Sequence, residues 1–133
     1  MVNPRVFIEV QGKKRGLLFT PSLYKVCKDR GWDITTTSDL ADIQSAYIKL
    51  FYAAAVNYDE IERFNDPQRE TFDFTLSDME IWAMLYKEEF ARVFNIAYEC
   101  LTGKSLKEAA VEIQESTKKK SLWLGIMKLL RLS

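Results

Sequence analysis

Residues 40–60 read LADIQSAYIKLFYAAAVNYDE, and this stretch determines the fold because its apolar residues cover more than one face of a helix. Apolar residues recur at intervals of three and four, the spacing that aligns side chains along an α-helix. This series comprises Leu40, Ile43, Tyr47, Leu50, Phe51 and Ala54. The run FYAAAV, residues 51–56, extends the apolar surface around the cylinder. Because helices that are apolar all round are buried, we predict a central helix that organises the fold.

Upstream of this helix, the sequence predicts a β-hairpin followed by a first helix. Three alternating apolar residues share one face of the first strand: Val6, Ile8 and Val10. Gly12 supplies the turn conformation, and a second short run leads to Phe19. The pair at 20–21 (TP) combines a capping hydroxyl with a proline at the first helical position, and Gly31 ends that helix.

Downstream, residues 75–78 (TLSD) begin a long helix that Gly103 ends. Its predicted buried stripe comprises Met79, Ala83, Tyr86, Phe90, Val93, Ala97 and Leu101, with Trp82 and Phe94 beside it. An aromatic stripe could line a cofactor pocket, but core packing is the far commoner cause of this spacing. Residues 105–108 (SLKE) form a capping box that predicts a further short helix.

Together these elements predict an α+β fold that is mostly α-helical, with a small N-terminal β-hairpin followed by four to five helices. A chain of 133 residues can build one domain with one core. We assign residues 1–117 to this single α+β domain and residues 118–133 to a basic, amphipathic C-terminal tail helix. The first ten residues are too short and too charged for a signal peptide, and we expect a cytoplasmic protein in a bacterial host cell.

The charge of the chain is balanced overall but unevenly distributed. Lys plus Arg and Asp plus Glu both number 19, which gives no general attraction to nucleic acid. Residues 57–117 carry 6 basic and 14 acidic groups, whereas residues 118–133 carry 5 basic and no acidic groups. The predicted helix after Gly103 exposes Glu108, Glu112 and Glu115, which would face phosphates in a DNA-reading helix-turn-helix. We therefore expect no nucleic-acid partner.

An acidic segment is the one candidate for catalysis. Residues 57–74 hold six carboxylates: Asp59, Glu60, Glu62, Asp66, Glu70 and Asp73. A metal-dependent enzyme using the segment 59–80 is a distant alternative, since the segment lacks the glycine of a calcium loop and the chain has no histidine. A solvated connection with a short helical turn is the preferred interpretation. We expect no enzyme activity, no cofactor and no metal ion.

Three stretches resemble the tail assembly chaperones of long-tailed double-stranded DNA phages and prophages. They are VFIEVQGKKRGLLFTPSLYKVCKDRG, SAYIKLFYAAAVNYDE and FTLSDMEIWAML, and the resemblance covers residues 5–100. In that family a short hairpin around a Gly-Lys turn leads into a phenylalanine and a first helix. Here Gly12, Lys13 and Phe19 match that feature, and residues 50–53 (LFYA) match the centre of the following apolar helix.

The resemblance implies a non-enzymatic phage or prophage tail assembly chaperone that self-associates. Its implied partners are further copies of the chain, the tape-measure protein and the tail-tube protein, and its implied role is to keep the apolar helices of the tape-measure protein soluble. The alternative is a structural or adaptor component of a virion or another assembly, with the same fold and no chaperone role.

The C-terminal tail supplies the candidate partner-binding residues. On a helix, a broad apolar arc is flanked by three lysines, and the candidates are Lys118, Lys119, Lys120, Leu122, Trp123, Ile126, Met127 and Leu130. We place packing on the chain's own core or on a neighbouring copy first, a client peptide second and a membrane surface third. Our specific hypothesis is that residues 121–132 dock on a neighbouring copy, with the lysines near acidic groups such as Glu108, Glu112 or Glu115.

Overall fold

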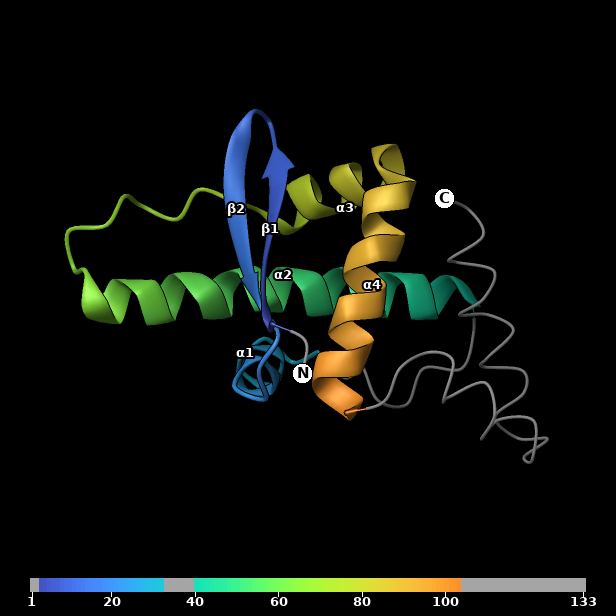
Figure 1. Cartoon of the computed structure of the whole chain (residues 1–133), viewed down its shortest axis with the longest axis horizontal. Helices are drawn as coiled ribbons and strands as arrows, with labels where there is room; N and C mark the ends of the chain where they lie inside the picture. Colours follow the sequence, from blue (N-terminus) through green and yellow to red (C-terminus); the bar gives the residue numbers. More distant parts are fainter. Residues whose placement is uncertain (1–2, 33–39, 104–133) are drawn as a thin grey trace.

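The computed structural model describes residues 3–32 and 40–103, and it confirms a mostly helical α+β fold (Figure 1). In chain order the described elements are β1 (Arg5–Val10), β2 (Lys13–Leu18), α1 (Leu23–Asp29), α2 (Leu40–Asn65), α3 (Leu76–Leu85) and α4 (Lys87–Thr102). The short helix predicted after residue 105, the domain boundary at 117 and the tail at 118–133 lie outside the described residues.

The two strands form the predicted antiparallel hairpin. Val10 pairs with Lys13, so the connecting turn has two residues, Gln11 and Gly12. Both have positive φ angles, 55° and 75°, which is the turn geometry that matches the twist of a two-stranded hairpin. The burial of Val6, Ile8 and Val10 alternates with exposed neighbours, as predicted.

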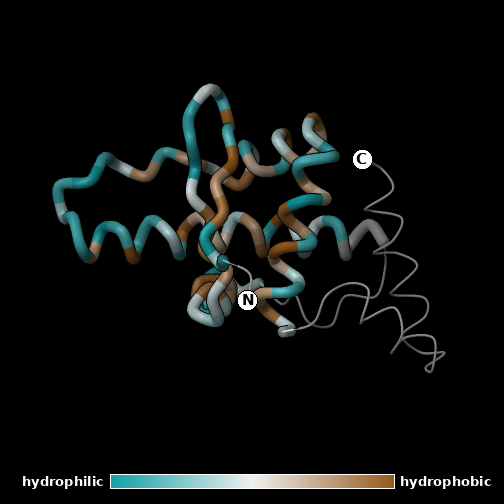
Figure 2. The backbone as a smooth tube through the Cα atoms, viewed as in Figure 1, coloured by the Kyte–Doolittle hydropathy of each residue, from teal (hydrophilic) through white to brown (hydrophobic). Residues whose placement is uncertain are grey.

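Helix α2 is the centre of the fold, as the sequence predicts. All six residues of the FYAAAV run are buried, because the hairpin, α1, α3 and α4 surround this part of the helix (Figure 1). The C-terminal end of α2 extends beyond these elements and is largely hydrophilic (Figure 2). The helix therefore has a buried middle and a solvated end.

Aromatic rings connect the hairpin end to the helices across the core. Phe51 of α2 contacts Phe19 after β2, with ring centroids 5.6 Å apart, and Phe90 of α4, with centroids 4.9 Å apart. Phe90 in turn lies 6.4 Å from the ring of Trp82 in α3. Edge and tilted contacts of this kind add to the free energy gained from burial alone.

The predicted start of α1 differs from the observed one in its hydrogen bonding. The Thr20 hydroxyl does not cap α1; it accepts a hydrogen bond from the buried Asn57 side chain of α2 at 3.1 Å. Asn57 also donates to the Leu18 carbonyl at 3.0 Å, so it ties α2 to the end of β2. The predicted C-terminal stop is confirmed, because Gly31 has φ 73° and its N–H donates to the Lys28 carbonyl.

The predicted single long helix is wrong, because the chain bends at Tyr86. Helix α3 ends at Leu85 and α4 begins at Lys87, and α4 crosses α2 in a different direction (Figure 1). Tyr86 is consequently 54% exposed and does not belong to the buried stripe. The other large stripe residues near the bend, Met79 and Phe90, are buried as predicted. The bend places Phe90 between α2 and α3, so tertiary packing overrides a continuous helical pattern.

The prediction that residues 57–74 form a solvated connection is wrong for its first half. Helix α2 continues to Asn65, and within it Asn57 and Asp59 are buried. The carboxylate of Asp59 is tolerated there because two arginines pair with it: Arg63, one helical turn further along α2, and Arg69, which reaches it from outside the helix. Residues 66–74, which we call the strap segment, then return along α2 to the start of α3.

Candidate interaction surface

Helix α3 carries an apolar face that no described residue covers. Its inner face, made of Met79, Trp82 and Ala83, is buried against the core. The outer residues remain solvent-exposed: Ile81 (48%), Met84 (61%) and Leu85 (66%), followed by Tyr86 (54%). Ile81, Met84 and Leu85 are spaced three and four residues apart and so share one side of the helix. We call these four residues the α3 face.

Shallow hollows flank the α3 face on two sides. One, of about 370 Å³, lies between α3 and the N-terminal half of α2, where Met84 and Glu80 face Ser45, Ile48 and Lys49. The other, of about 210 Å³, lies against the hairpin tip. Val10, Gln11, Asp78, Ile81, Trp82, Leu85 and Tyr86 line it. The exposed apolar side chains therefore form a ridge between two grooves, a shape that suits an elongated apolar partner.

The chain begins α3 with a well-defined cap, which fixes the orientation of the face. The Thr75 hydroxyl accepts a hydrogen bond from the Asp78 N–H at 3.1 Å, and the Asp78 carboxylate accepts one from the Thr75 N–H at 3.0 Å. The helix start predicted at residues 75–78 is confirmed, and this reciprocal capping box is its physical basis. Asp78 also accepts a hydrogen bond from Gln11 at 3.2 Å, which joins α3 to the hairpin turn.

The charged groups around the α3 face are mostly acidic. Asp78 and Glu80 lie on α3 itself, and Glu88 and Glu89 occupy the first turn of α4. Glu89 is paired with Arg92 at 2.9 Å, and this arginine lowers the pKa of the Glu89 carboxyl. Lys49 across the α2 hollow and Lys87 at the start of α4 are the neighbouring cations. A partner with basic groups flanking an apolar stripe would match this pattern.

Sequence reasoning missed this surface because it assigned residues 76–102 to one helix with one buried stripe. The signal was present in LSDMEIWAML, which is apolar on two sides at once. A helix with that composition is ordinarily buried all round. Here the described residues bury only one side of α3. The exposure of its second apolar side therefore indicates a candidate binding surface.

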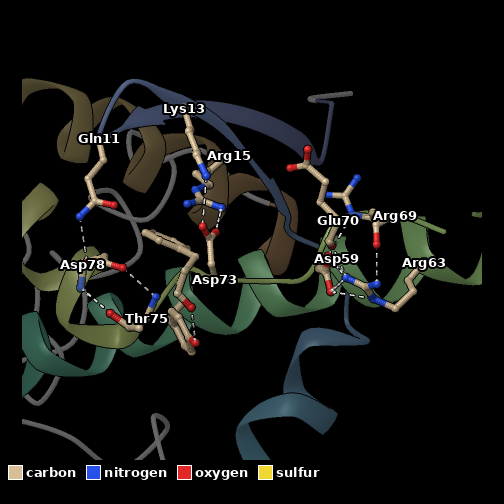
Figure 3. A network of polar contacts seen from close by, with 12 residues as sticks. Gln11, Lys13, Arg15, Asp59, Arg63, Arg69, Glu70, Asp73, Thr75 and Asp78 are labelled. Atoms are coloured by element: carbon tan, nitrogen blue, oxygen red, sulfur yellow. Dashed lines mark hydrogen bonds and ion pairs between the residues drawn. The ribbon is translucent and has the colours of Figure 1, made fainter. Parts of the chain in front are cut away.

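The acidic segment, the alternative candidate site, is occupied by internal ion pairs. Figure 3 shows Asp59 between two arginines: Arg63 Nη2 lies 3.1 Å and Arg69 Nε 2.9 Å from Asp59 Oδ1. Hydrogen bonding to Asp59 raises the pKa of Arg69. Arg63 also donates to the backbone carbonyls of Arg69 at 3.0 Å and Glu70 at 2.8 Å. This cluster fastens the strap segment to α2.

A second cluster fastens the strap segment to the hairpin (Figure 3). Asp73 binds Arg15 of β2 at 2.7 Å and Lys13 at 3.1 Å, and these cations lower the pKa of Asp73 to about 2. The guanidinium of Arg15 also lies over the Phe74 ring, 5.1 Å from its centroid. The Tyr52 hydroxyl donates to the Phe74 carbonyl at 2.8 Å, which joins the same segment to α2.

A groove of about 580 Å³ runs along these clusters between β2, α2 and the strap segment. Three of its four cations are already paired with carboxylates: Lys13 and Arg15 with Asp73, and Arg69 with Asp59. The fourth, Lys14, lies over the ring of Phe7 at 4.4 Å. The cations that an anionic ligand would need are therefore already engaged in contacts within the protein. These contacts stabilise the fold around the groove.

The described residues offer little reactive chemistry. Among residues 3–32 and 40–103, no group of three potential metal ligands comes together. Burial raises the pKa values of both cysteines, Cys27 and Cys100, which keeps them as thiols rather than nucleophilic thiolates. Burial likewise raises the pKa of Tyr47 to about 12. In the same part of the chain, no helix combines the length and apolar character that a membrane crossing requires.

The predicted partner-binding residues lie outside the described part of the chain. They are Lys118, Lys119, Lys120, Leu122, Trp123, Ile126, Met127 and Leu130. Their docking therefore stays a prediction.

Comparison of the chain with protein-family models, with curated proteins and with solved structures finds no match.

Proposed function

We propose that this protein is a non-enzymatic phage or prophage tail assembly chaperone, which self-associates and binds the tape-measure protein during tail assembly. The observation that carries the proposal is the α3 face, a continuous apolar ridge with four exposed large side chains. An exposed apolar patch of this kind marks a site for protein binding. The resemblance of residues 5–100 to the chaperone family supplies the kind of partner.

The client in this proposal is a long, helical, apolar protein, and the α3 face suits such a client physically. A helix of the tape-measure protein would place its apolar side on Ile81, Met84 and Leu85 and its flanking basic groups near Glu80. Methionine is well suited to this role, because its unbranched side chain adapts to different partners. The tail-tube protein would then replace the chaperone as tube subunits polymerise along the client.

The polar clusters support the non-enzymatic part of the proposal. Asp59 and Asp73, two of the six carboxylates in the acidic segment, each bind two cations of the same domain. A general acid or base needs a proton-transfer partner on the substrate rather than an internal salt bridge. The geometry of these carboxylates therefore favours a scaffold role.

Co-expression with a phage tape-measure protein tests the proposal. We expect the client to stay in the supernatant with the wild-type chain and to precipitate with Leu85→Glu, which places a charge on the α3 face. Phe64→Glu is the matched control, since Phe64 is 87% exposed near the far end of α2 and should leave client solubility unchanged. Equal precipitation with and without the wild-type chain would reject the chaperone assignment.

A further inference from the structure

The α3 face is open to solvent on its outer side, and the chain itself contains an apolar segment that could cover it. Within residues 118–133, six large apolar residues fall on one arc of a helix: Leu122, Trp123, Ile126, Met127, Leu129 and Leu130. Lys128 and Arg131 fall opposite them. The apolar stripe is about three turns long and the ridge of Ile81, Met84 and Leu85 spans little more than one helical turn, so part of the stripe is enough to cover the ridge.

Charge also matches between the two surfaces. Residues 118–133 carry five basic and no acidic groups. On the receiving side, Glu80 lies in the hollow beside Met84, and Glu88 follows Tyr86 in the first turn of α4. Lys49 and Lys87 reduce this acidic character and Asp78 adds to it, whereas Glu89 is already paired with Arg92. The lysines at 118–120 would therefore approach a rim of opposite sign.

The connection is long enough for the segment to return to its own α3. Helix α4 starts one residue after α3 and has 16 residues, so its far end lies about 24 Å along its axis from α3. The 17 residues from 104 to 120 can span up to about 56 Å when extended. The tether thus exceeds the required distance by about twofold.

We propose that residues 121–132 dock on the α3 face of the same molecule, with Lys118–Lys120 beside Glu80. The own chain is favoured over a second copy because a tether of this length holds the segment at an effective concentration near the millimolar range. The docking does not depend on the proposed function. If that function holds, this segment and a client helix compete for Met84 and Leu85.

Cross-linking of the full chain tests where the segment docks. Ser45→Cys lies in the hollow beside Met84, and Ser121→Cys marks the start of the segment; both are placed in a Cys100→Ser background. With a short bismaleimide reagent, we expect an internal cross-link in the double variant that runs as a monomer. Ser121→Cys combined with Asn65→Cys, at the other end of α2, should give none.

A mixture of the two single-cysteine chains separates the alternatives. Cross-linked dimers in that mixture, with no internal cross-link in the double variant, would show that the segment binds a neighbouring copy and would overturn the proposal. The absence of any cross-link to Ser45→Cys would overturn it as well.

Hydrogen exchange gives a second readout that needs no reagent. We expect amides in residues 121–132 to exchange at least about tenfold faster in Leu85→Glu than in the wild type, since one apolar anchor is lost. The matched variant Phe64→Glu should leave that exchange unchanged. Equal exchange in all three chains would reject the α3 face as the docking surface, whether or not the protein binds a tape-measure client.

Discussion

The strap segment and α3 are consecutive in the chain, yet they solve opposite problems. In residues 66–74, Arg69 pairs with Asp59 of α2 and Asp73 pairs with Arg15 of β2, so this region is closed by internal contacts. Along residues 76–86, the inner apolar side chains are buried and the outer ones, including Met84 and Leu85, contact solvent. The first region stabilises the domain through internal contacts, whereas the second exposes an apolar surface that can bind a partner.

In both regions the role of the side chains differs from the role that their residue types alone suggest. Clustered carboxylates suggest chemistry, but here Asp59 and Asp73 stabilise a loop by accepting hydrogen bonds from three arginines and a lysine. Apolar residues at helical spacing suggest core, but Leu85 projects away from it. The partner of a side chain, rather than its chemical class, separates structural from functional groups.

The largest change in stability is expected on the inner face of α3, and a substitution on its outer face provides the comparison. Trp82→Ala removes a buried ring that packs on Phe90 of α4, and we expect the free energy of unfolding to fall by about 3 to 5 kcal/mol. Leu85→Ala, one turn along on the outer face, should cost under about 1 kcal/mol. Urea denaturation followed by circular dichroism measures both. Similar losses for the two variants would mean that the outer face is core.

A smaller loss is expected when the strap segment is released from α2. Asp59→Ala leaves Arg63 and Arg69 without their shared carboxylate, and we expect a loss of about 2 kcal/mol. The value lies at the lower end for charged hydrogen bonds because both arginines are about one-third exposed. Glu60→Ala, the exposed neighbour, should change the unfolding free energy by under about 0.5 kcal/mol.

The sequence predicts those features that depend on nearby residues. The hairpin follows from alternation around Gly12, the buried middle of α2 follows from FYAAAV, and the start of α3 follows from a capping box. Gly31 and Gly103 both end their helices with positive φ angles, as predicted. Each of these signals is contained within a few residues of the feature it specifies.

The features that the sequence did not predict depend on distant residues. The bend at Tyr86 has no glycine or proline to announce it, and it is explained by the packing of Phe90 on Phe51. The extension of α2 beyond residue 57 depends on Arg69, which neutralises Asp59 from ten residues away. Of the α3 face, Tyr86 depends on that same bend, because it lies at the break between α3 and α4.

A moderate loss is expected where the hairpin approaches α2 most closely. A Cβ atom at Gly16 would lie 2.5 Å from the ring of Tyr58. That ring cannot move freely, because Phe7 contacts it edge-on and the guanidinium groups of Arg5 and Arg69 lie over it. We expect Gly16→Ala to cost about 1 to 2 kcal/mol through overpacking.

A double-mutant cycle checks this assignment. Tyr58→Ala removes the obstructing ring, so adding Gly16→Ala to it should cost less than Gly16→Ala costs in the wild type. Strictly additive losses would place the strain elsewhere in the hairpin.

The smallest effect is expected at Asp73, the exposed link between the strap segment and the hairpin. Hydrogen bonds from Arg15, and then from Lys13, lower its pKa from 3.8 to about 2 in the folded protein. A carboxyl whose pKa is lower in the folded than in the unfolded state stabilises the fold above its unfolded pKa. This contribution is therefore complete at neutral pH and disappears as the pH falls from about 4 through about 2. Asp73→Asn should lower the urea midpoint slightly at pH 7, and the difference from the wild type should shrink toward pH 2 and vanish below it. Added salt should shrink the difference at pH 7, because exposed ion pairs are screened. A difference that persists unchanged at pH 2 would show that Asp73 stabilises the protein through packing rather than through its charge. Only the Asp59 cluster would then support the view that ion pairs hold the strap segment in place.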